Sequence, residues 1–227
     1  MQILILVAVL AVLILGPGFW VKRVLARYSQ PADRYGHTGA ETARRLLDAL
    51  QLQDVVGEIS GTGDHYDLAA RAVRLAAGNY QGRSLTAVTV AAHEVGHALQ
   101  HAEGYAPLLW RTRLVQWVSP VEKTGAVLMM LTPVIIGVTR LPLAGLLVLL
   151  GGMMTLGSAV VIHLLTLPTE FDASFGRAMP LLKKQDVLYA ADERHARRLL
   201  TAAAMTYVAA SLMSLLNVAR WIAILRR

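Results

Sequence analysis

A His-Glu-x-x-His pattern lies within the apolar segment of residues 84–104 (SLTAVTVAAHEVGHALQHAEG). In a helix, His93 and His97 share one face about 5–6 Å apart, which lets two imidazoles bind one ion. Zn²⁺ accepts this arrangement at Zn–N distances of about 2.0–2.1 Å. Glu94 is turned about 100° from His93, where its carboxylate can take a proton from water beside the metal. The pattern predicts a zinc hydrolase.

The residues around this pattern favour a buried helix. An apolar run, Leu85–Ala92, precedes His93 and would exclude water from a bound metal. Gly96 costs about 1 kcal/mol relative to Ala inside a helix, so its presence predicts that another segment packs against it. The alternative interpretation is that His93 and His97 are two core histidines with no ligand role.

The composition favours a membrane protein. The 227 residues include no cysteine, so disulfides and cysteine zinc fingers are excluded and a metal must use His and carboxylate ligands. Hydrophobic residues make up 55% of the chain and are concentrated in a few long runs. The net charge of +7 does not indicate nucleic-acid binding, because Lys and Arg stand beside these runs and form no stripe of Arg and aromatic residues.

Four apolar runs predict a mainly α membrane protein with about four transmembrane helices. Ile3–Val21 is long enough to cross a hydrocarbon core of about 30 Å. It lacks the basic start and the cleavage site of a signal peptide, and Trp20 followed by Lys22 and Arg23 is typical of an interface anchor. The other three runs are Gly125–Val138, which is short for a span, Leu143–Leu167 and Leu199–Ala219.

These runs divide the chain into five expected parts. The parts are an N-terminal membrane anchor (1–21), a zincin-like metallopeptidase part with the motif helix (22–122), a transmembrane hairpin (123–167), a segment with the third metal ligand (168–198) and a C-terminal transmembrane helix (199–227). Most of the 22 Lys and Arg fall in residues 22–123 and 177–198, and such a bias marks the cytoplasmic side. We therefore expect a multi-pass cell-membrane protein with its active site facing the cytoplasm, although Arg226 and Arg227 count against this orientation.

Three further elements are expected in residues 22–122. Thr38 and Glu41 have the spacing of a capping box and open an amphipathic helix. Short alternation between His65 and Leu75 predicts a β-hairpin, whose Val73–Leu75 edge could pair with an extended peptide; an ordinary surface loop is the alternative. Trp and Arg are interleaved in Pro107–Ser119, which places that segment against the membrane surface.

A catalytic zinc ion needs a third protein ligand in addition to His93 and His97. His101 lies on the same helix, and one straight helix cannot surround a tetrahedral ion with three ligands. Glu170 follows the third apolar run and lies on the same expected side of the membrane as the motif, so we predict that it is the ligand. The remaining candidates are His163, Asp172, Glu193 and His195.

Four sequence blocks carry a resemblance to a known family. They are Asp64–Asp67 (DHYD), Ala91–Gln100 (AAHEVGHALQ), Leu167–Ser174 (LPTEFDAS) and Ala203–Ala210 (AAMTYVAA). Together with the order of the apolar runs, these blocks resemble the bacterial membrane zinc peptidases called neutral zinc metallopeptidase family 2 over essentially the entire chain. The resemblance implies a membrane-embedded zinc peptidase and does not supply its substrates.

Residues 170–174 (EFDAS) also resemble the Glu-Phe-x-Ala-Asp element of the CAAX-processing and heat-shock membrane gluzincins. That resemblance implies that Glu170 is the third ligand. Ser174 stands where those families have an Asp that supports a ligand, and such supporting groups typically change metal affinity or activity about 10–100-fold. Asp172 or another group is then expected to take over this task.

The leading functional interpretation is a membrane-embedded zinc metallopeptidase that cleaves peptides or membrane proteins at the interface between bilayer and cytosol. Zinc is held by His93, His97 and Glu170, and Glu94 activates water. Candidates for stabilising the oxyanion are Tyr189, His195, Arg177 and Tyr207. One alternative is a site-2-type intramembrane protease, against which the polar residues that directly follow the motif argue. Another is a non-catalytic zinc-binding membrane scaffold or adaptor.

Overall fold

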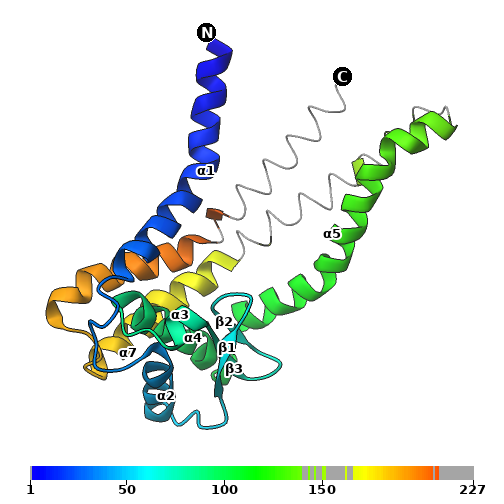
Figure 1. Ribbon diagram of the computed structural model, residues 1–227. Coiled ribbons are helices and arrows are strands. Elements are labelled where there is room, and N and C mark those ends of the chain that lie inside the picture. The colour runs from blue at the N-terminus through cyan, green and yellow to red at the C-terminus, as the bar shows by residue number, and fades with distance from the viewer. Residues whose placement is uncertain are drawn as a thin grey trace. The chain divides into compact units, whose positions relative to one another are not determined.

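The computed structural model describes residues 2–139, 143, 146, 150, 151, 162, 166–206, 208 and 209. Figure 1 shows the described helices and strands along the chain, which divides into two units. Unit 1 contains Met1–Gly16, Trp110–Thr166 and Tyr207–Arg227, and unit 2 contains Pro17–Leu109 and Leu167–Thr206. The motif and Glu170 both belong to unit 2, so the candidate site can be described within that unit.

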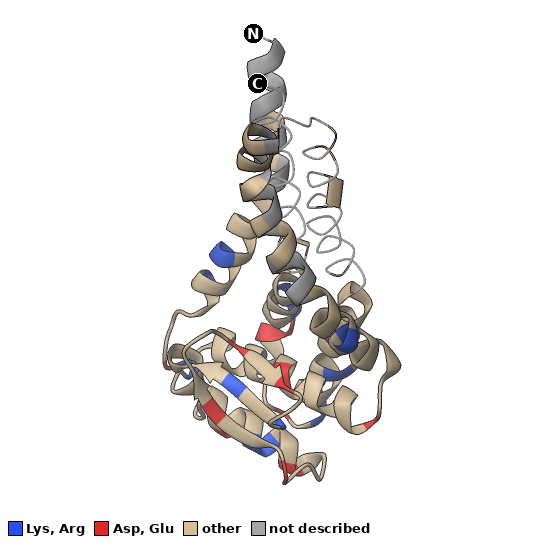
Figure 2. Cartoon of the chain, turned by 90° about the vertical axis from the view of Figure 1, so that its right-hand side faces the viewer, with Lys and Arg blue, Asp and Glu red and all other residues tan. Residues whose placement is uncertain are grey.

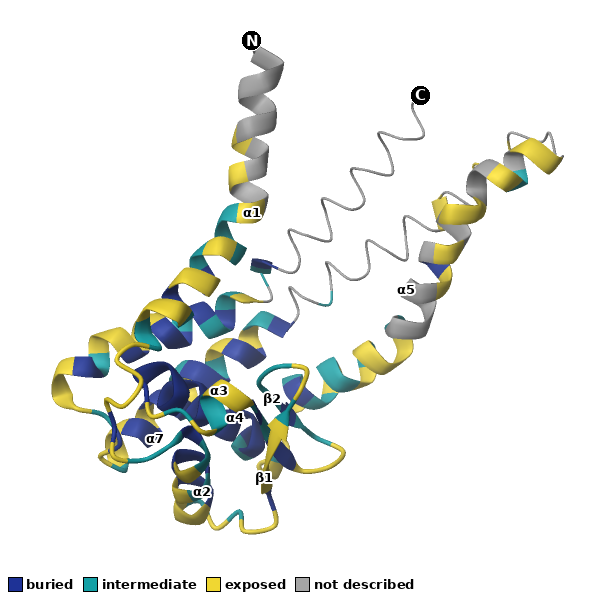
Figure 3. Ribbon diagram, viewed as in Figure 1, coloured by how far each residue is buried: buried dark blue, intermediate teal, exposed yellow. Residues whose placement is uncertain are grey.

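Helix α4 (Leu85–Ala102) carries the motif. Ser84 caps its start, because the Ser84 hydroxyl accepts a hydrogen bond of 3.1 Å from the backbone N–H of Ala87. Side chains are buried along nearly the whole helix (Figure 3). A helix whose residues are apolar or small on every side is expected to lie inside a core. The motif therefore lies in a buried part of unit 2.

Helix α2 (Gly39–Ala49) begins with the predicted capping box. The Thr38 hydroxyl accepts from the Glu41 N–H at 3.1 Å, and the Glu41 carboxylate accepts from the Thr38 N–H at 2.7 Å. Leu46 and Leu47 are buried against α4, whereas the opposite side of α2 is exposed (Figure 3). The expected amphipathic helix is confirmed.

Three short strands form a sheet in the order β1-β3-β2. β2 (His65–Asp67) and β3 (Ala72–Ala76) pair antiparallel, as the expected hairpin requires. β1 (Val56–Ser60) pairs in parallel with β3 and was not expected, because its sequence VGEIS shows no clear alternation. The short helix α3 (Ala77–Tyr80) follows β3 directly.

The prediction that Val73–Leu75 offers a free edge is wrong. β3 is the central strand, and Val73 pairs with Gly57 on one side and with Tyr66 on the other. The outer edges of the described sheet therefore belong to β1 and β2.

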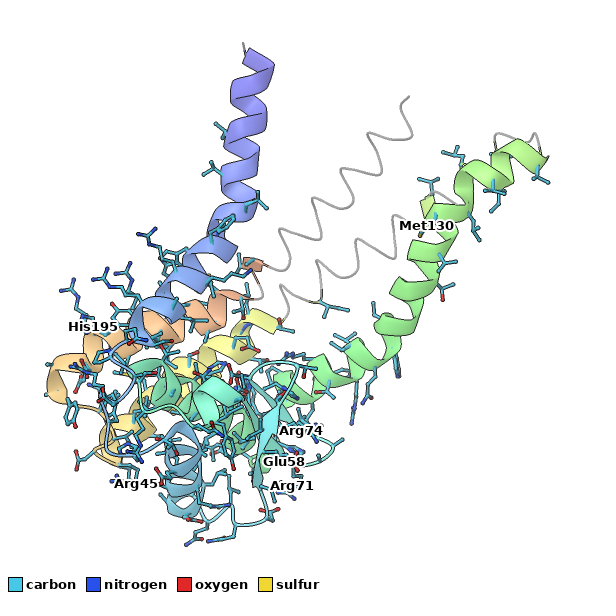
Figure 4. The ribbon with its side chains drawn as sticks, in the orientation of Figure 1. Arg45, Glu58, Arg71, Arg74, Met130 and His195 are labelled. Carbon is cyan, nitrogen blue, oxygen red and sulfur yellow. The ribbon has the colours of Figure 1, made fainter. Side chains whose placement is uncertain are left out.

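An arginine on the outward face joins all three strands. Arg74 of β3 donates to the Glu58 carboxylate of β1 at 2.9 Å and also contacts the Asp67 carboxylate of β2. Figure 4 shows Arg74 and Glu58 together on this face, and Figure 2 shows Lys, Arg, Asp and Glu mixed over the same part of the chain. Arg74, Glu58 and Asp67 make this face polar, while the buried side chains of Val73 and Leu75 lie on the other side of β3.

Glu170 lies just before a π-helix. Residues 166–171 are α-helical and lead into η1 (Asp172–Ala178), in which the backbone follows the wider π-helical path. A Cβ atom on Gly96 would lie only 2.6 Å from the carbonyl oxygen of Ala173, so α4 and η1 approach too closely for any other residue. The prediction that a segment packs against Gly96 is confirmed. The chain continues through α7 (Met179–Lys184), η2 (Ala190–Asp192) and helical residues 193–206.

The expectation of about four transmembrane helices is wrong. Within the part of the chain that the structure describes, no helix combines the length and the apolar character needed to cross a membrane. Helix α5 (Ala106–Thr139) runs without interruption through the expected surface segment and the expected span Gly125–Val138. The charged residues Glu122 and Lys123 confine the apolar part of this helix to the residues that follow them, which are few for a span.

The described residues at the start of the expected last span also differ from that expectation, and residues 207 and 210–219 of this span lie outside the described part of the chain. The expected last span begins at Leu199, but Leu199 and Leu200 are buried in the core of unit 2, together with Val21 and Val24 of α1 (Gln2–Tyr28). Apolar side chains here pack against protein. Most of the expected span Leu143–Leu167 lies outside the described residues. The cytoplasmic orientation was obtained by counting spans, so it loses its basis with them.

Candidate metal centre

The three predicted ligands converge in unit 2. His93 and His97 lie one turn apart on α4 with ring centroids separated by 4.8 Å. The carboxylate oxygen Oε2 of Glu170 lies 3.3 Å from Nε2 of His93 and 3.4 Å from Nε2 of His97. One ligand atom from each residue lies within 4.8 Å of the others, and all three residues are buried. No other such group of His, Asp or Glu occurs among the described residues.

The hydrogen bonds of Gln100 fix the tautomer of His97. Gln100 is fully buried, and its side-chain Nε2 donates to the carbonyl of Thr169 at 2.9 Å and to the carboxylate of Asp172 at 2.7 Å. Both partners can only accept, so the amide oxygen must face His97. This oxygen lies 2.9 Å from Nδ1 of His97. Nδ1 therefore carries the proton, and Nε2 is directed toward Glu170 as an electron-pair donor.

Ser174 fixes His93 in the same tautomer by a shorter route. The Ser174 hydroxyl donates its one proton to the carbonyl of Leu200 at 3.2 Å, so its oxygen accepts from Nδ1 of His93 at 3.1 Å. Ser174 thus makes the supporting contact expected of the Asp in the resembling families. Asp172 supports the other histidine through Gln100. The supporting task is shared between the two residues.

These atoms fit a divalent cation. With both Nδ1 atoms protonated, neutral His93 and His97 turn their Nε2 lone pairs toward a carboxylate, an arrangement that a cation makes favourable. Burial alone would raise the pKa of Glu170, but donation from Nε2 of His93 and His97, which requires a proton on these atoms, holds that pKa well below its usual value. A metal ion would take the place of such a proton between the imidazoles and the carboxylate. Two imidazole nitrogens and one carboxylate oxygen match the donor set of catalytic zinc sites that keep a fourth position open.

Glu94 lies beside the ligand group. It follows His93 on α4 and is 6% exposed. Its place in the helix turns its side chain about 100° from that of His93, and it is not one of the three ligands that converge. A carboxylate in this position can exchange a proton with water next to a metal.

The other candidate ligands that the structure describes have different partners. Nδ1 of His101 lies 2.9 Å from the hydroxyl of Tyr66, which joins α4 to β2. Asp172 accepts hydrogen bonds from Gln100 and Arg177. Glu193 pairs with Lys183, His195 lies 3.7 Å from Asp192, and His163 falls outside the described residues.

The candidates for stabilising an oxyanion that the structure describes also contact other groups. Tyr189 stacks on Tyr35 with ring centroids 4.9 Å apart. Arg177 binds Asp172, and His195 packs against a ring of α1. Tyr207 lies outside the described residues. No oxyanion role is assigned to these four residues.

The role of Gln100 was not predicted from the sequence. It follows His97 by three residues, and this spacing brings two side chains together on a helix. The spacing of His97 and Gln100 can be read from the sequence, but many solvent-exposed pairs of helical residues have the same spacing. Only the contacts with Thr169 and Asp172, which are distant in the sequence, show that the amide is oriented for His97.

Comparisons with known proteins agree with this geometry. Residues 3–226 match the family described as "Putative neutral zinc metallopeptidase". The chain is 41% identical over 221 residues to "Putative membrane protease YugP" of Bacillus subtilis (strain 168), covering 95% of this chain and 94% of that relative. No solved structure matches the chain. The family match spans nearly the whole sequence, and the chain belongs to the neutral zinc metallopeptidase family.

Proposed function

We propose that this chain is a zinc-dependent peptidase in which His93, His97 and Glu170 hold the metal and Glu94 transfers protons. The observation that carries the proposal is the convergence of three buried ligand atoms within 4.8 Å. Both imidazoles are also held in the tautomer that directs Nε2 toward Glu170. Membership of a zinc metallopeptidase family supports peptide-bond hydrolysis as the reaction.

Zinc bound by these residues would polarise the scissile carbonyl and lower the pKa of water to about 7. Glu94 accepts the proton that the attacking water gives up and returns it to the leaving nitrogen. Gln100 and Ser174 keep Nδ1 of the two histidines protonated, which preserves the orientation of both rings. The residues of the chain therefore supply orientation and proton transfer in a buried site.

The proposal is tested by purifying the wild type and Glu94→Gln and measuring bound zinc and cleavage of a broad peptide mixture. Loss of a general base lowers rates about 10²–10⁴-fold, so the variant is expected to keep its zinc and lose cleavage to this extent. Glu193→Gln is the matched control, because it makes the same change at a surface carboxylate paired with Lys183. The control is expected to retain both properties.

Two results would contradict the proposal. Undiminished cleavage by Glu94→Gln would remove Glu94 from the reaction. A zinc-loaded wild type that cleaves no component of peptide and membrane-protein mixtures would favour the alternative of a non-catalytic zinc-binding scaffold. The retained zinc in both proteins separates these outcomes from simple loss of the metal site.

We also propose that the substrates are peptides or membrane proteins close to a lipid bilayer. The Bacillus subtilis relative is named a membrane protease. Within unit 2, Val21 and Val24 of α1 are buried, whereas Phe19 is 70% exposed and lies next to exposed Lys22 and Arg23. An exposed aromatic ring beside cations fits the headgroup region of a bilayer.

A tether series tests this second proposal. Enzyme reconstituted in vesicles is offered one cleavable segment attached at several distances from a membrane anchor, with the same segment in soluble form as the control. Cleavage is expected to be fastest for a segment held near the bilayer. Equal rates for all tether lengths and for the soluble segment would show that the membrane does not select substrates.

A further inference from the structure

A line of polar contacts leads from His97 to the surface of unit 2. Gln100, which accepts from His97, donates to the Asp172 carboxylate at 2.7 Å. The same Asp172 oxygen, Oδ2, accepts from Nε of Arg177 at 2.7 Å. Arg177 extends at its other end to the carboxylate of Glu103, with Nη1 at 2.5 Å. His93 has no part in these contacts.

The Arg177 side chain is held from several sides. It is only 11% exposed, although Glu103 at its outer end is 54% exposed. Its guanidinium lies over the ring of Tyr105, 5.3 Å from the ring centroid. Gly176 makes room for this arrangement, since a Cβ atom there would lie 2.6 Å from Oδ1 of Asp172. The end of α4 and the π-helix η1 are thus joined through one arginine.

Arg177 and Gln100 donate to the same oxygen of Asp172. If the amide of Gln100 turned over, its oxygen would face the Asp172 carboxylate and the Thr169 carbonyl, and its NH₂ group would face Nδ1 of His97. His97 would then have to accept at Nδ1 and carry its proton on Nε2, the atom directed toward Glu170. A fixed carboxylate at Asp172 opposes this reversal. Arg177 holds that carboxylate through Nε while its Nη1 is held by Glu103.

We infer that Arg177 is a positioning residue, which acts through Asp172 and Gln100 to keep Nε2 of His97 available to a metal. The inference deepens the proposed zinc site and rests on it. The inference also predicts that the effect is confined to one of the two histidines. Ser174, and not this line of contacts, holds His93, so a change at Arg177 reaches one histidine and spares the other.

The test uses the full chain labelled with ¹⁵N histidine and freed of metal, at a pH where the histidines are neutral. In the wild type, ¹⁵N shifts are expected to report protonated Nδ1 on both His93 and His97. In Arg177→Met, His97 is expected to become a mixture of tautomers while His93 is unchanged. Zinc affinity, measured by competition with a chelator, is expected to fall about 10–100-fold, the range found when a group that orients a ligand is removed.

Arg45→Met is the matched control, because Arg45 makes an exposed hydrogen bond to the Gln185 backbone in the same unit. It is expected to leave both tautomers and the zinc affinity as in the wild type. Arg177→Lys keeps the positive charge without the planar guanidinium, and we expect a smaller but measurable mixture of tautomers at His97. This variant serves as the test if Arg177→Met does not fold.

Wild-type tautomer and zinc affinity in a folded Arg177 variant would overturn the inference. An equal disturbance of His93 and His97 would do so as well, because it would indicate general loosening of unit 2. Neither measurement requires peptide cleavage. A chain that binds zinc but hydrolyses nothing would therefore contradict the proposed peptidase activity while leaving the role of Arg177 to be decided on its own evidence.

Discussion

Two buried carboxylates in unit 2, Asp192 and Glu170, have very different neighbours. Asp192 is 2% exposed and receives two hydrogen bonds from the Arg34 guanidinium, at 2.5 and 2.7 Å, and one from the Tyr35 hydroxyl at 2.7 Å. Glu170 is 1% exposed and faces two imidazoles. A guanidinium is always charged, whereas an imidazole carries charge only when protonated.

This difference separates a carboxylate that stabilises the fold from one that can bind a cation. Burial alone would raise the pKa of both carboxyl groups. For Asp192, hydrogen bonds and charge interactions with Arg34 and Tyr35 lower the pKa below its usual value. For Glu170, His93 and His97 do so. The negative charge of Asp192 is therefore balanced by the permanent charge of Arg34. The negative charge of Glu170 is balanced only when His93 or His97 carries an additional proton or when a metal ion is bound.

Asp192 fastens two distant segments of unit 2. Arg34 and Tyr35 lie between α1 and α2, and Asp192 ends η2. Tyr35 also stacks on Tyr189 at 4.9 Å. His195, labelled in Figure 4, lies 3.7 Å from Asp192 through Nδ1 and 5.1 Å from the ring of Tyr28 on α1. We expect changes in this cluster to alter stability and to leave metal binding unchanged.

The largest effect is expected from Glu170→Gln. Removing one of three ligands should lower zinc affinity more than about 100-fold, beyond the range for groups that only orient a ligand. Asp192→Asn makes the same change of charge at the other carboxylate and should keep the wild-type affinity, as should His101→Ala. The zinc content per chain after dialysis, and the zinc affinity from competition with a chelator, are measured for all three variants. Equal zinc content in wild type and Glu170→Gln would remove Glu170 from the site and end the contrast.

Gly96→Ala is expected to have the next largest effect, because it forces the segment after Glu170 away from α4. The added Cβ would lie 2.6 Å from the backbone oxygen of Ala173, so backbone must move. Overpacking of this kind costs about 1–3 kcal/mol of the free energy of unfolding, and zinc affinity should fall with it. Gly78→Ala is the control, since nothing lies within 4 Å of its Cβ position. Urea unfolding and chelator competition report the two quantities, and an unchanged affinity would show that the site tolerates the shift.

The parts predicted from the sequence are those that depend on local spacing. The pattern from His93 to His97 indicated a helix with both imidazoles on one face, and Thr38 with Glu41 indicated the capping box. Glu170 was chosen for another reason, its expected place on the same side of the membrane as the motif, together with the resemblance of residues 170–174. The structure brings Glu170 to the two histidines although the expected spans are wrong. For the motif helix and the capping box, the choice could be made from a short stretch of residues with few alternatives.

The parts that were missed depend on contacts between distant residues or on backbone geometry. Arg34 and Asp192 are 158 positions apart, and no motif links them. Nothing in the sequence indicates that η1 is π-helical or that Ser174 accepts from His93. Apolar runs were taken for membrane spans, yet Leu199 and Leu200 are core residues of unit 2, because an apolar side chain is buried equally well by protein.

Tyr35→Phe tests whether the contacts of Asp192 stabilise the fold without affecting the metal site. The change removes one hydrogen bond to a buried carboxylate, and such bonds to charged groups contribute about 1.5–3 kcal/mol. The free energy of unfolding should fall by about this amount, with zinc affinity unchanged. Tyr189→Phe is the control, because it keeps the ring that stacks on Tyr35 and removes a hydroxyl from a residue that is 54% exposed. A drop in zinc affinity with Tyr35→Phe would show that the two carboxylates are not independent.

The smallest effect concerns acid pH and again compares wild type with Asp192→Asn. The pKa of Asp192 is lowered in the folded protein, whereas the unfolded value is about 3.9. As pH falls from the unfolded toward the folded pKa, unfolding takes up a proton at Asp192, and the free energy of unfolding decreases by at most about 1.4 kcal/mol per pH unit. Above the unfolded pKa this contribution is fully present.

Asp192→Asn has no carboxyl group that can take up this proton. Its free energy of unfolding should therefore decline less steeply below about pH 4. The comparison is made by urea unfolding of metal-free protein, because the pKa of Glu170 is lowered as well and a bound metal would add its own pH dependence. Glu170 and the surface carboxylates titrate in both proteins, so the difference between the two curves isolates Asp192. If the free energy of unfolding declined equally steeply at acid pH in both proteins, Arg34 and Tyr35 would not favour the charged form of Asp192. The distinction between Asp192 and Glu170 would then rest on geometry alone.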